Sequence, residues 1–264
     1  MPDRARLALV VPCFNEAQRL DRPAFDEALR TMPWLDLCFV DDGSTDATAA
    51  RLHDIEQAWP GRVRVVVLPT NRGKAEAVRT GLLTVSATAA YCGFWDADLA
   101  APLAEVATLR EVFQRQPQAE WVWGIRLRAL GRHITRRPLR HYLGRLFASA
   151  ASILLGIDSY DTQCGAKLFR VTPLLHTALS EPFRSRWIFD VELLSRADAI
   201  LRHDAQRAVA TVVYEQPLAV WEHKAGSKVK PTDFLRALQE LWMVRGERAH
   251  WARALVTGTP TSST

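Results

Sequence analysis

The chain has 264 residues, of which 48% are hydrophobic and 24% charged, a balance typical of an ordinary globular protein with one sizeable core. No stretch reaches the roughly 18 consecutive apolar residues that a membrane-spanning helix requires, so any membrane contact is expected to be peripheral. The formal net charge of +5 favours an anionic partner, which leaves nucleic acid, a phosphorylated substrate and an anionic membrane surface open.

The first half of the chain alternates short apolar runs with longer amphipathic segments. The runs are rich in β-branched and aromatic residues and too short for helices, which predicts buried parallel strands at 7–11, 37–41, 63–68, 91–96 and 121–125. Helices are expected between them, near 23–31, 46–59, 74–87 and 102–115. This rhythm predicts an α/β fold, Rossmann-like, with a mainly parallel sheet flanked by helices and a binding crevice outside the C-terminal strand ends.

A polar motif follows each of the first four predicted strands. PCFNE begins at Pro12, DDGSTD at Asp41, NRGK at Asn71 and DAD at Asp96. Each motif is ordinary by itself, because the same residues form turns and helix starts. Four of them in order at one sheet edge indicate a binding site. The lack of GxGxxG after any strand argues against a dinucleotide site.

The rhythm changes after residue 125. From Trp121 to Ile157 the chain has no Asp or Glu, and it carries Arg126, Arg128, Arg132, Arg136, Arg137, Arg140 and Arg145. This basic stretch is either a working cationic surface or a solvated face. Apolar residues at helical spacing over 139–154 and 234–242 predict two basic amphipathic helices, which either pack on the domain or lie on a membrane surface.

Cysteine usage and the chain ends bear on location. The four cysteines are isolated and lack metal-ligand spacing, so we expect buried free thiols in a reducing compartment. The N-terminus has no signal-peptide pattern. We therefore expect a cytoplasmic protein, with any membrane contact peripheral at the inner face of the cytoplasmic membrane. Residues 1–250 are expected to form one domain and residues 251–264 a disordered tail.

The DAD motif places two carboxylates, Asp96 and Asp98, directly after a predicted strand, with no basic residue close to them in sequence. Carboxylates at i and i+2 can both bind one Mg²⁺ or Mn²⁺, whose other positions go to water and phosphate oxygens. Either aspartate can instead cap the helix that follows. The motif alone leaves both interpretations open.

The other motifs offer further polar groups at the same edge. Gly73 permits close approach of the backbone, and Lys74 is placed to meet a phosphate at a helix start. Asn15 and Glu16 add side chains at the rim. A buried carboxylate of DDGSTD can either serve the turn or accept hydrogen bonds from a base edge.

Taken together, the motifs resemble the inverting family 2 glycosyltransferases with a GT-A fold. The resemblance runs from about residue 7 to residue 241 through VVPCFNE, FVDDGSTD, NRGKAEAVRTGL, FWDADLAAP, GIRLR, DTQCGAKLF, RWIFDVELL and HKAGSKV. Within the family the sequence is most similar to dolichyl-phosphate β-glucosyltransferases and dolichol-phosphate mannosyltransferases, and DTQCG and RWIFDVEL are closer to the glucosyl branch. The resemblance implies a nucleotide-sugar half at about 5–125 and an acceptor half at about 126–250.

The resemblance also implies a nucleotide pocket. Its residues are Pro12, Asn15, Glu16 and Asp42, with Asp42 facing the base. Gly73 and Lys74 are expected to bind the donor at the same edge.

A metal site for Mg²⁺ or Mn²⁺ at Asp96 and Asp98 is the next implication, with Asp96 also contacting the donor. We therefore expect the partner of these carboxylates to be a metal ion carrying a nucleotide diphosphate rather than a side chain. Some mannosyltransferase relatives place a Gln near the metal at the position of Ala100, so no third protein ligand is expected there.

A lipid phosphate acceptor would give the basic stretch a chemical role. Planar guanidinium groups suit phosphate oxygens, so Arg126 and one or more of Arg136, Arg137 and Arg140 are expected to hold the acceptor phosphate near the anomeric carbon. Lys228 of the GSK motif is a second candidate.

The FDVEL segment carries two carboxylates that face different ways on a helix, so only one is expected at the reacting centre. Asp190, nearer the helix start, is favoured over Glu192. It either orients the acceptor or acts as a base; an ionised phosphate acceptor needs no base, whereas a sugar hydroxyl does. Asp161 and Gln163 either shape the same crevice or form a structural turn.

The sequence therefore predicts an enzyme that transfers a hexose with inversion from a nucleotide sugar to a polyprenyl phosphate. UDP-glucose is the favoured donor and GDP-mannose the second. An enzyme of the same fold acting on a saccharide hydroxyl is the alternative. A nucleic-acid-binding protein would use the basic stretch, but the sequence has no recognisable RNA- or DNA-binding signature, and no nucleic-acid partner is expected.

Overall fold

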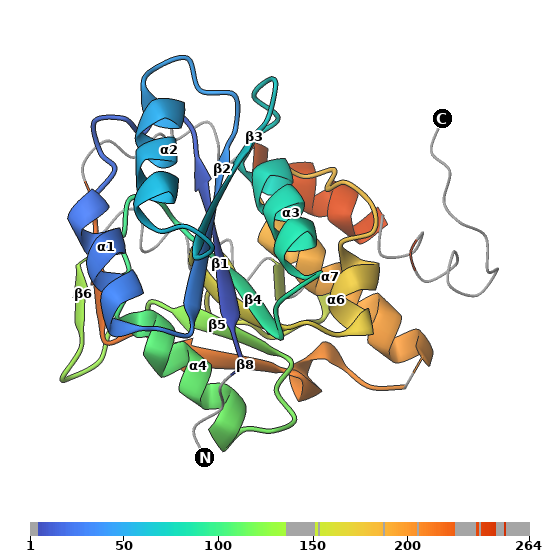
Figure 1. Ribbon diagram of the computed structural model, residues 1–264. Coiled ribbons are helices and arrows are strands. Elements are labelled where there is room, and N and C mark those ends of the chain that lie inside the picture. Colours follow the sequence, from blue (N-terminus) through green and yellow to red (C-terminus); the bar gives the residue numbers. More distant parts are fainter. Residues whose placement is uncertain are drawn as a thin grey trace.

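A seven-stranded sheet forms the centre of the protein in the computed structural model (Figure 1). The structure describes residues 5–135, 151–152, 154–186, 188–204, 206–224, 236–237, 239–246 and 251. The strands, in their order across the sheet, are β3 (Val63–Val67), β2 (Leu35–Asp41), β1 (Leu7–Cys13), β4 (Tyr91–Trp95), β7 (Ala166–Arg170), β5 (Trp121–Ile125) and β8 (Val213–Pro217). Only β7 runs against the others, pairing antiparallel with both β4 and β5.

Helices cover both faces of the sheet (Figure 1). One face carries α1 (Arg22–Thr31), α2 (Thr48–Ala58) and α4 (Glu105–Arg115); the other carries α3 (Lys74–Val85), α6 (Pro173–Ala178) and α7 (Phe189–Asp204), with the short 3-10 helix η1 (Val209–Thr211). In β1, Leu7 and Leu9 pack in the core under α1, α2 and α4. Ala8 and Val10 pack in the core under α3, α6 and α7. Since alternate residues of a strand point to opposite faces, a strand buried on both sides is a continuous apolar run.

A small parallel sheet lies beside the loop that follows β4. It consists of β6 (His133–Thr135) and β9 (Val220–Glu222). The backbone N–H of Glu222 donates to the carbonyl of Ala100 over 2.8 Å. The buried carboxylate of Glu105, in the first turn of α4, accepts from the N–H groups of Ala219 and Val220. These contacts hold the C-terminal segment against the DAD loop.

The predicted α/β fold with a mainly parallel sheet is confirmed, as are five predicted strands and four helices, with shifted bounds. The helix predicted near 102–115 begins three residues later than expected, because α4 starts at Glu105 rather than at Pro102. The strands β6, β7, β8 and β9 were not predicted. All four cysteines are buried and free, as expected.

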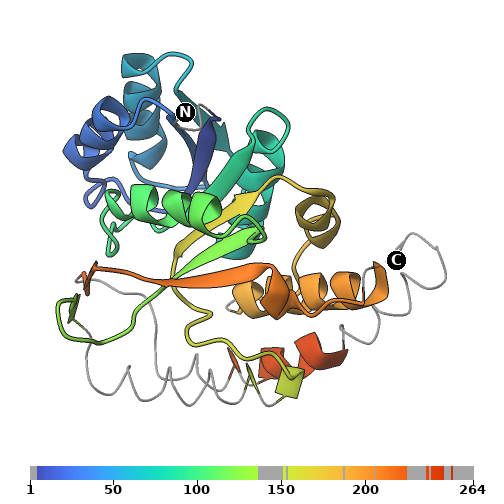
Figure 2. The same ribbon diagram turned by 90° about the horizontal axis from the view of Figure 1, so that it is seen from below.

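Several predicted residues lie outside the described part of the chain. They are Arg136, Arg137, Arg140, Arg145 and Lys228, together with most of the helix predicted over 139–154 and of the tail over 251–264. Within the described part, no helix has the length and apolar character to cross a membrane. Helical residues 239–246 contribute Leu241 and Val244 to the same core as α7, and Figure 2 shows α4 on the opposite side of the sheet from α7.

The close approach of α3 to the sheet depends on Gly81. A Cβ built at Gly81 lies 2.3 Å from a methyl group of Val10 and 2.9 Å from a methyl group of Val40. The contact matters for the site, because it sets the position of the helix whose first residue is Lys74.

We predict that Gly81→Ala lowers the free energy of unfolding by about 1–3 kcal/mol, because the added methyl group overpacks the α3–sheet contact. The matched control is Gly246→Ala, in a helix where a Cβ meets nothing within 4 Å. There the substitution should leave stability unchanged or raise it, since Ala is the better helix former. Urea denaturation of both variants measures the difference. Equal effects at the two glycines would contradict this packing.

Candidate active site

The loops after β1 and β2 are joined by hydrogen bonds through Asn15. Its backbone N–H donates to Ser44 Oγ, and its side-chain oxygen accepts from the N–H of Thr45, both over 2.9 Å. Asn15 has φ of 52°, a left-handed conformation that Asn tolerates better than most residues. Asn15 therefore joins these two loops at the sheet edge, and its place in a nucleotide pocket stays a prediction.

Pro12 and Glu16 flank Asn15. Pro12 lies on β1 opposite Val40, and it costs no hydrogen bond towards β4 because the β1–β4 ladder ends at Val10. Glu16 is buried, and its carboxylate accepts from the Arg19 guanidinium over 2.8 and 2.5 Å. Both residues lie at the edge where the sequence placed them.

Asp42 holds the loop before α3. Its two carboxylate oxygens accept from the backbone N–H groups of Arg72 and Gly73, over 2.7 and 2.8 Å. Burial raises the pKa of Asp42 above its ordinary value, although these two N–H groups act in the opposite direction. Gly73 has φ of 92°, where a side chain is disfavoured, and it precedes the first residue of α3. The role of Asp42 in facing a base stays a prediction, and its visible role is to place Lys74.

Asp96 and Asp98 follow β4, and neither caps α4, which begins seven residues after Asp98 at Glu105. Asp98 accepts from the N–H of Ala100 over 3.1 Å. Burial raises the pKa of Asp98, and the neighbouring charge of Asp96 adds to the rise. Neutralisation of Asp98, by a proton or by a cation nearby, is therefore favoured.

The Asp96 carboxylate packs against a residue without a side chain. The Asp96 N–H donates to the carbonyl of Gly165 over 3.0 Å. A Cβ at Gly165 would lie 2.0 Å from Asp96 Oδ2, so only glycine leaves this carboxylate in place. Gly165 is the last residue of the DTQCG segment, in which Asp161 and Gln163 are expected either to shape the crevice or to form a structural turn.

The structure corrects one expectation about the two aspartates: Asp96 does have a side-chain partner. Lys74 Nζ lies 2.5 Å from Asp96 Oδ1, and it also lies 5.8 and 5.9 Å from the ring centres of Phe94 and Phe189. Burial lowers the pKa of Lys74, but the charges of Asp96 and Asp190 outweigh it, and the net direction is upward. Lys74 and Asp96 are 22 positions apart in sequence, but the first residue of α3 lies in space beside the C-terminal end of β4.

A second lysine, which the sequence reasoning missed, lies on β7. Lys167 is fully buried, and its Nζ is 2.8 Å from Asp190 Oδ1. It also donates to the carbonyls of Thr162 and Cys164, over 2.9 and 2.5 Å, and lies 4.5 Å from the ring centre of Trp123. Burial raises the pKa of Asp190, while Lys167 and Lys74 act in the opposite direction.

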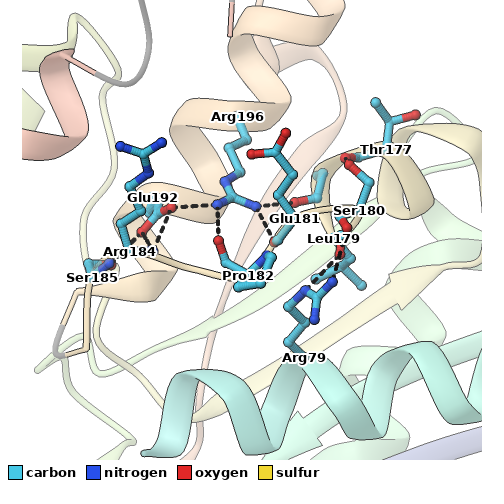
Figure 3. A network of polar contacts seen from close by, with 11 residues as sticks. Arg79, Thr177, Leu179, Ser180, Glu181, Pro182, Arg184, Ser185, Glu192 and Arg196 are labelled. Carbon is cyan, nitrogen blue, oxygen red and sulfur yellow. Dashed lines mark hydrogen bonds and ion pairs between the residues drawn. The ribbon is translucent and has the colours of Figure 1, made fainter. Parts of the chain in front are cut away.

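Glu192 faces away from Asp190, as the helical spacing predicted. Figure 3 shows Glu192 receiving hydrogen bonds from the segment before α7, including the backbone and hydroxyl of Ser185, each over 2.8 Å. Arg196 pairs with Glu192 over 2.6 Å and also donates to the carbonyls of Ala178, Glu181 and Pro182. This network fixes the chain that leads into the first turn of α7, and therefore the position of Asp190.

Arg126, predicted to hold an acceptor phosphate, pairs with Asp161. Its Nε and Nη2 donate to the two Asp161 oxygens over 2.6 and 2.7 Å. Burial lowers the pKa of Arg126, but Asp161 outweighs it and the net direction is upward. Trp221 of β9 lies 5.3 Å away, measured from its ring centre to the guanidinium carbon. The pairing holds the loop after β5 to the DTQCG segment. Asp161, expected either to shape the crevice or to form a structural turn, thus orients Arg126, and the neighbouring Trp221 was not predicted.

A hollow of about 250 Å³ opens beside the DAD loop. It is lined by Arg19, Asp21, Asp98, Leu99 and Lys224. Among the residues that the structure describes, no three His, Cys, Asp or Glu side chains gather as a metal cage. The carboxylate oxygens of Asp96 and Asp98 nevertheless fit Mg²⁺ or Mn²⁺, because a cation, the Lys74 ammonium, already lies on Asp96.

The family model for glycosyl transferase family 2 matches residues 8–176. The chain therefore belongs to glycosyltransferase family 2 and is a glycosyltransferase.

Two relatives and one solved structure show which glycosyltransferases the chain is similar to. Dolichyl-phosphate beta-glucosyltransferase of Drosophila melanogaster is 33% identical over 269 residues, which cover 95% of this chain and 76% of the relative. The enzyme of the same name from Dictyostelium discoideum is 29% identical over 249 residues, which cover 87% and 70%. A crystal structure of glucosyl-3-phosphoglycerate synthase from Mycobacterium tuberculosis with Mn²⁺ and UDP-glucose has a TM-score of 0.66 at 20% identity, covering 92% of this chain and 79% of that one. This likeness shows the GT-A fold that the sequence predicted.

We predict that Glu192→Ala lowers the free energy of unfolding by about 3–5 kcal/mol, because it leaves the buried Arg196 guanidinium without its carboxylate. The matched control is Glu27→Ala, which removes a pair between Glu27 and Arg30 whose side chains are both 62% exposed. Exposed pairs contribute about 0–1 kcal/mol. Chemical denaturation of both variants gives the comparison. Similar small losses would contradict a structural role for Glu192.

Proposed function

We propose that this glycosyltransferase transfers glucose from UDP-glucose to the phosphate of a polyprenyl lipid, with inversion at the anomeric carbon. The observation that carries the proposal is the similarity to dolichyl-phosphate beta-glucosyltransferases over most of the chain, 95% of it for the Drosophila enzyme. The cluster of Asp96, Asp98 and Lys74 at the sheet edge supports a diphosphate donor.

In the proposed reaction a phosphate oxygen of the acceptor attacks the anomeric carbon, and the bond from that carbon to the diphosphate breaks. The electron pair leaves with UDP, so the donor diphosphate gains negative charge. A divalent ion held by Asp96 and Asp98 supplies charge neutralisation for this leaving group when it is bound. Lys74 at the start of α3 adds a second positive charge, and the helix N-terminus a third favourable interaction.

The acceptor needs no general base in this reaction, because a phosphate monoester is already ionised near neutral pH. Asp190 is buried and paired with Lys167, which suits a positioning role. Arg126, with Asp161 fixing its orientation, is proposed to meet the acceptor phosphate, and Arg140 is the proposed partner from the basic stretch. GDP-mannose remains the second proposed donor.

Peripheral membrane contact is part of the proposal, because the lipid acceptor resides in a bilayer. Trp242 is 63% exposed on helical residues 239–246, next to the half-exposed Met243. The Arg245 guanidinium lies 5.6 Å from the Trp242 ring centre. An exposed tryptophan beside a cationic side chain suits the interface of an anionic membrane. We infer that this surface faces the lipid on the cytoplasmic side.

Product formation tests the proposal directly. The purified enzyme is incubated with Mn²⁺, UDP-glucose or GDP-mannose, and a polyprenyl phosphate; the matched acceptor is the same polyprenol without phosphate. We predict glucosyl transfer to the phosphate only, abolished by EDTA and restored by Mn²⁺. Asp98→Asn should lower the transfer rate by about tenfold to hundredfold, the range typical when groups around a bound metal are altered. Transfer to the polyprenol or to a saccharide alone would contradict the lipid-phosphate acceptor, and activity in EDTA would contradict the metal.

One observation favours the alternative, in which the acceptor is a saccharide hydroxyl: burial raises the pKa of Asp190, which suits a general base. Asp190→Asn alone cannot separate the two cases, because it leaves Lys167 buried without its carboxylate. The double variant Asp190→Asn, Lys167→Met removes both charges together.

We predict that Asp190→Asn loses stability and activity. The double variant should recover only part of both, because it removes the unpaired charge but also the hydrogen bonds that Lys167 donates to Thr162 and Cys164. Thermal melting measures the first property and glycolipid formation the second. A double variant that is more stable than Asp190→Asn yet keeps none of the transfer would favour the hydroxyl alternative, in which the Asp190 carboxylate is required at the reacting atoms.

A further inference from the structure

The two lysines of the site differ in how firmly they are held. Lys167 Nζ is fully buried and contacts three oxygen acceptors, which matches the three hydrogens of an ammonium group. Lys74 Nζ contacts Asp96 Oδ1, and the Lys74 side chain is 41% exposed. Lys167 is therefore a fixed part of the structure, whereas Lys74 has the solvent access to change partners.

The charges around Lys74 favour such a change. Asp96, Asp98 and Asp190 bring three carboxylates to one sheet edge, and Asp190 is already paired with Lys167. Lys74 is the cation on Asp96, one of the two proposed metal ligands. A divalent ion on Asp96 and the ammonium of Lys74 on the same oxygen would repel each other. The two cations therefore compete for Asp96.

We propose that Lys74 is an exchangeable counter-cation: it neutralises Asp96 in the free enzyme and moves to the donor diphosphate when a divalent ion takes its place. The inference rests on the proposed function, because it assumes a metal-bound diphosphate donor. The start of α3 favours the second position of Lys74, since a helix N-terminus attracts phosphate groups. The rings of Phe94 and Phe189, each within 6 Å of Nζ, flank the ammonium group.

The exchange has a thermodynamic consequence. Metal alone must displace Lys74 into solvent, whereas metal together with diphosphate gives Lys74 a new anionic partner. Each ligand therefore strengthens the binding of the other, and the coupling is reciprocal. Part of this coupling comes from direct contact between metal and diphosphate, so the share that belongs to Lys74 must be isolated by substitution.

The test is calorimetric titration of the whole protein with Mn²⁺ alone, UDP alone, and Mn²⁺ at saturating UDP. We predict that Lys74→Met and Lys74→Gln bind Mn²⁺ alone about fivefold to fiftyfold more tightly than the native protein, and that UDP binds more weakly to them when Mn²⁺ is present. The coupling factor should fall by a similar ratio, within the range typical of linked sites. Lys74→Arg keeps the charge and should restore weak binding of Mn²⁺ alone.

A control variant separates a local effect from a change in net charge. Arg64→Gln removes one positive charge near the start of β3, at the edge opposite the site, from a side chain that is exposed. Its Mn²⁺ affinity should equal that of the native protein. Unchanged or weaker Mn²⁺ binding in both uncharged Lys74 variants would overturn the exchange while leaving the proposed function standing. Failure of the native protein to bind Mn²⁺ even with UDP would overturn the metal-dependent function itself, and the exchange with it.

Discussion

The buried ammonium group of Lys167 is the contact on which the geometry of the site depends. A buried charge costs several kcal/mol unless it is paired and all its hydrogen bonds are made. Lys167 donates hydrogen bonds to the carbonyls of Thr162 and Cys164, and it is paired with Asp190. The first two contacts fix the backbone that leads to Gly165, against which the Asp96 carboxylate rests, and the third fixes the start of α7. One side chain thus joins the loop after β4, which carries the proposed metal ligands, to the start of α7.

The antiparallel strand β7 makes this arrangement possible. It lies between β4 and β5, so its first residues adjoin the C-terminal ends of both. The DTQCG segment enters the site directly before β7, and Asp161 orients Arg126 from that segment. The proposed metal ligands after β4 and the proposed acceptor arginine after β5 are consequently held by one stretch of backbone. A wholly parallel sheet would bring in no such segment at this edge.

Much of the fold follows from local patterns, because strands buried on both faces are continuous apolar runs. The opposite orientations of Asp190 and Glu192 also follow from helical geometry alone. The strand β7 is not predicted from such patterns, because Lys167 interrupts its apolar run. The ammonium group of Lys167 finds its partners only through contacts made after folding. The pairs Lys74–Asp96 and Arg126–Asp161 are not predicted either, because each joins residues far apart in sequence. A search for basic residues near Asp96 in sequence misses the lysine that topology brings to it.

Asp96 and Asp98 are proposed to hold together the divalent ion of a nucleotide-sugar donor. The most direct measurement is anomalous diffraction at the manganese edge from crystals of the protein grown with Mn²⁺ and UDP. We expect one strong peak within bonding distance of carboxylate oxygens of both Asp96 and Asp98, with UDP phosphate oxygens completing the coordination. A peak elsewhere, or UDP bound with no manganese at these carboxylates, would contradict this proposal.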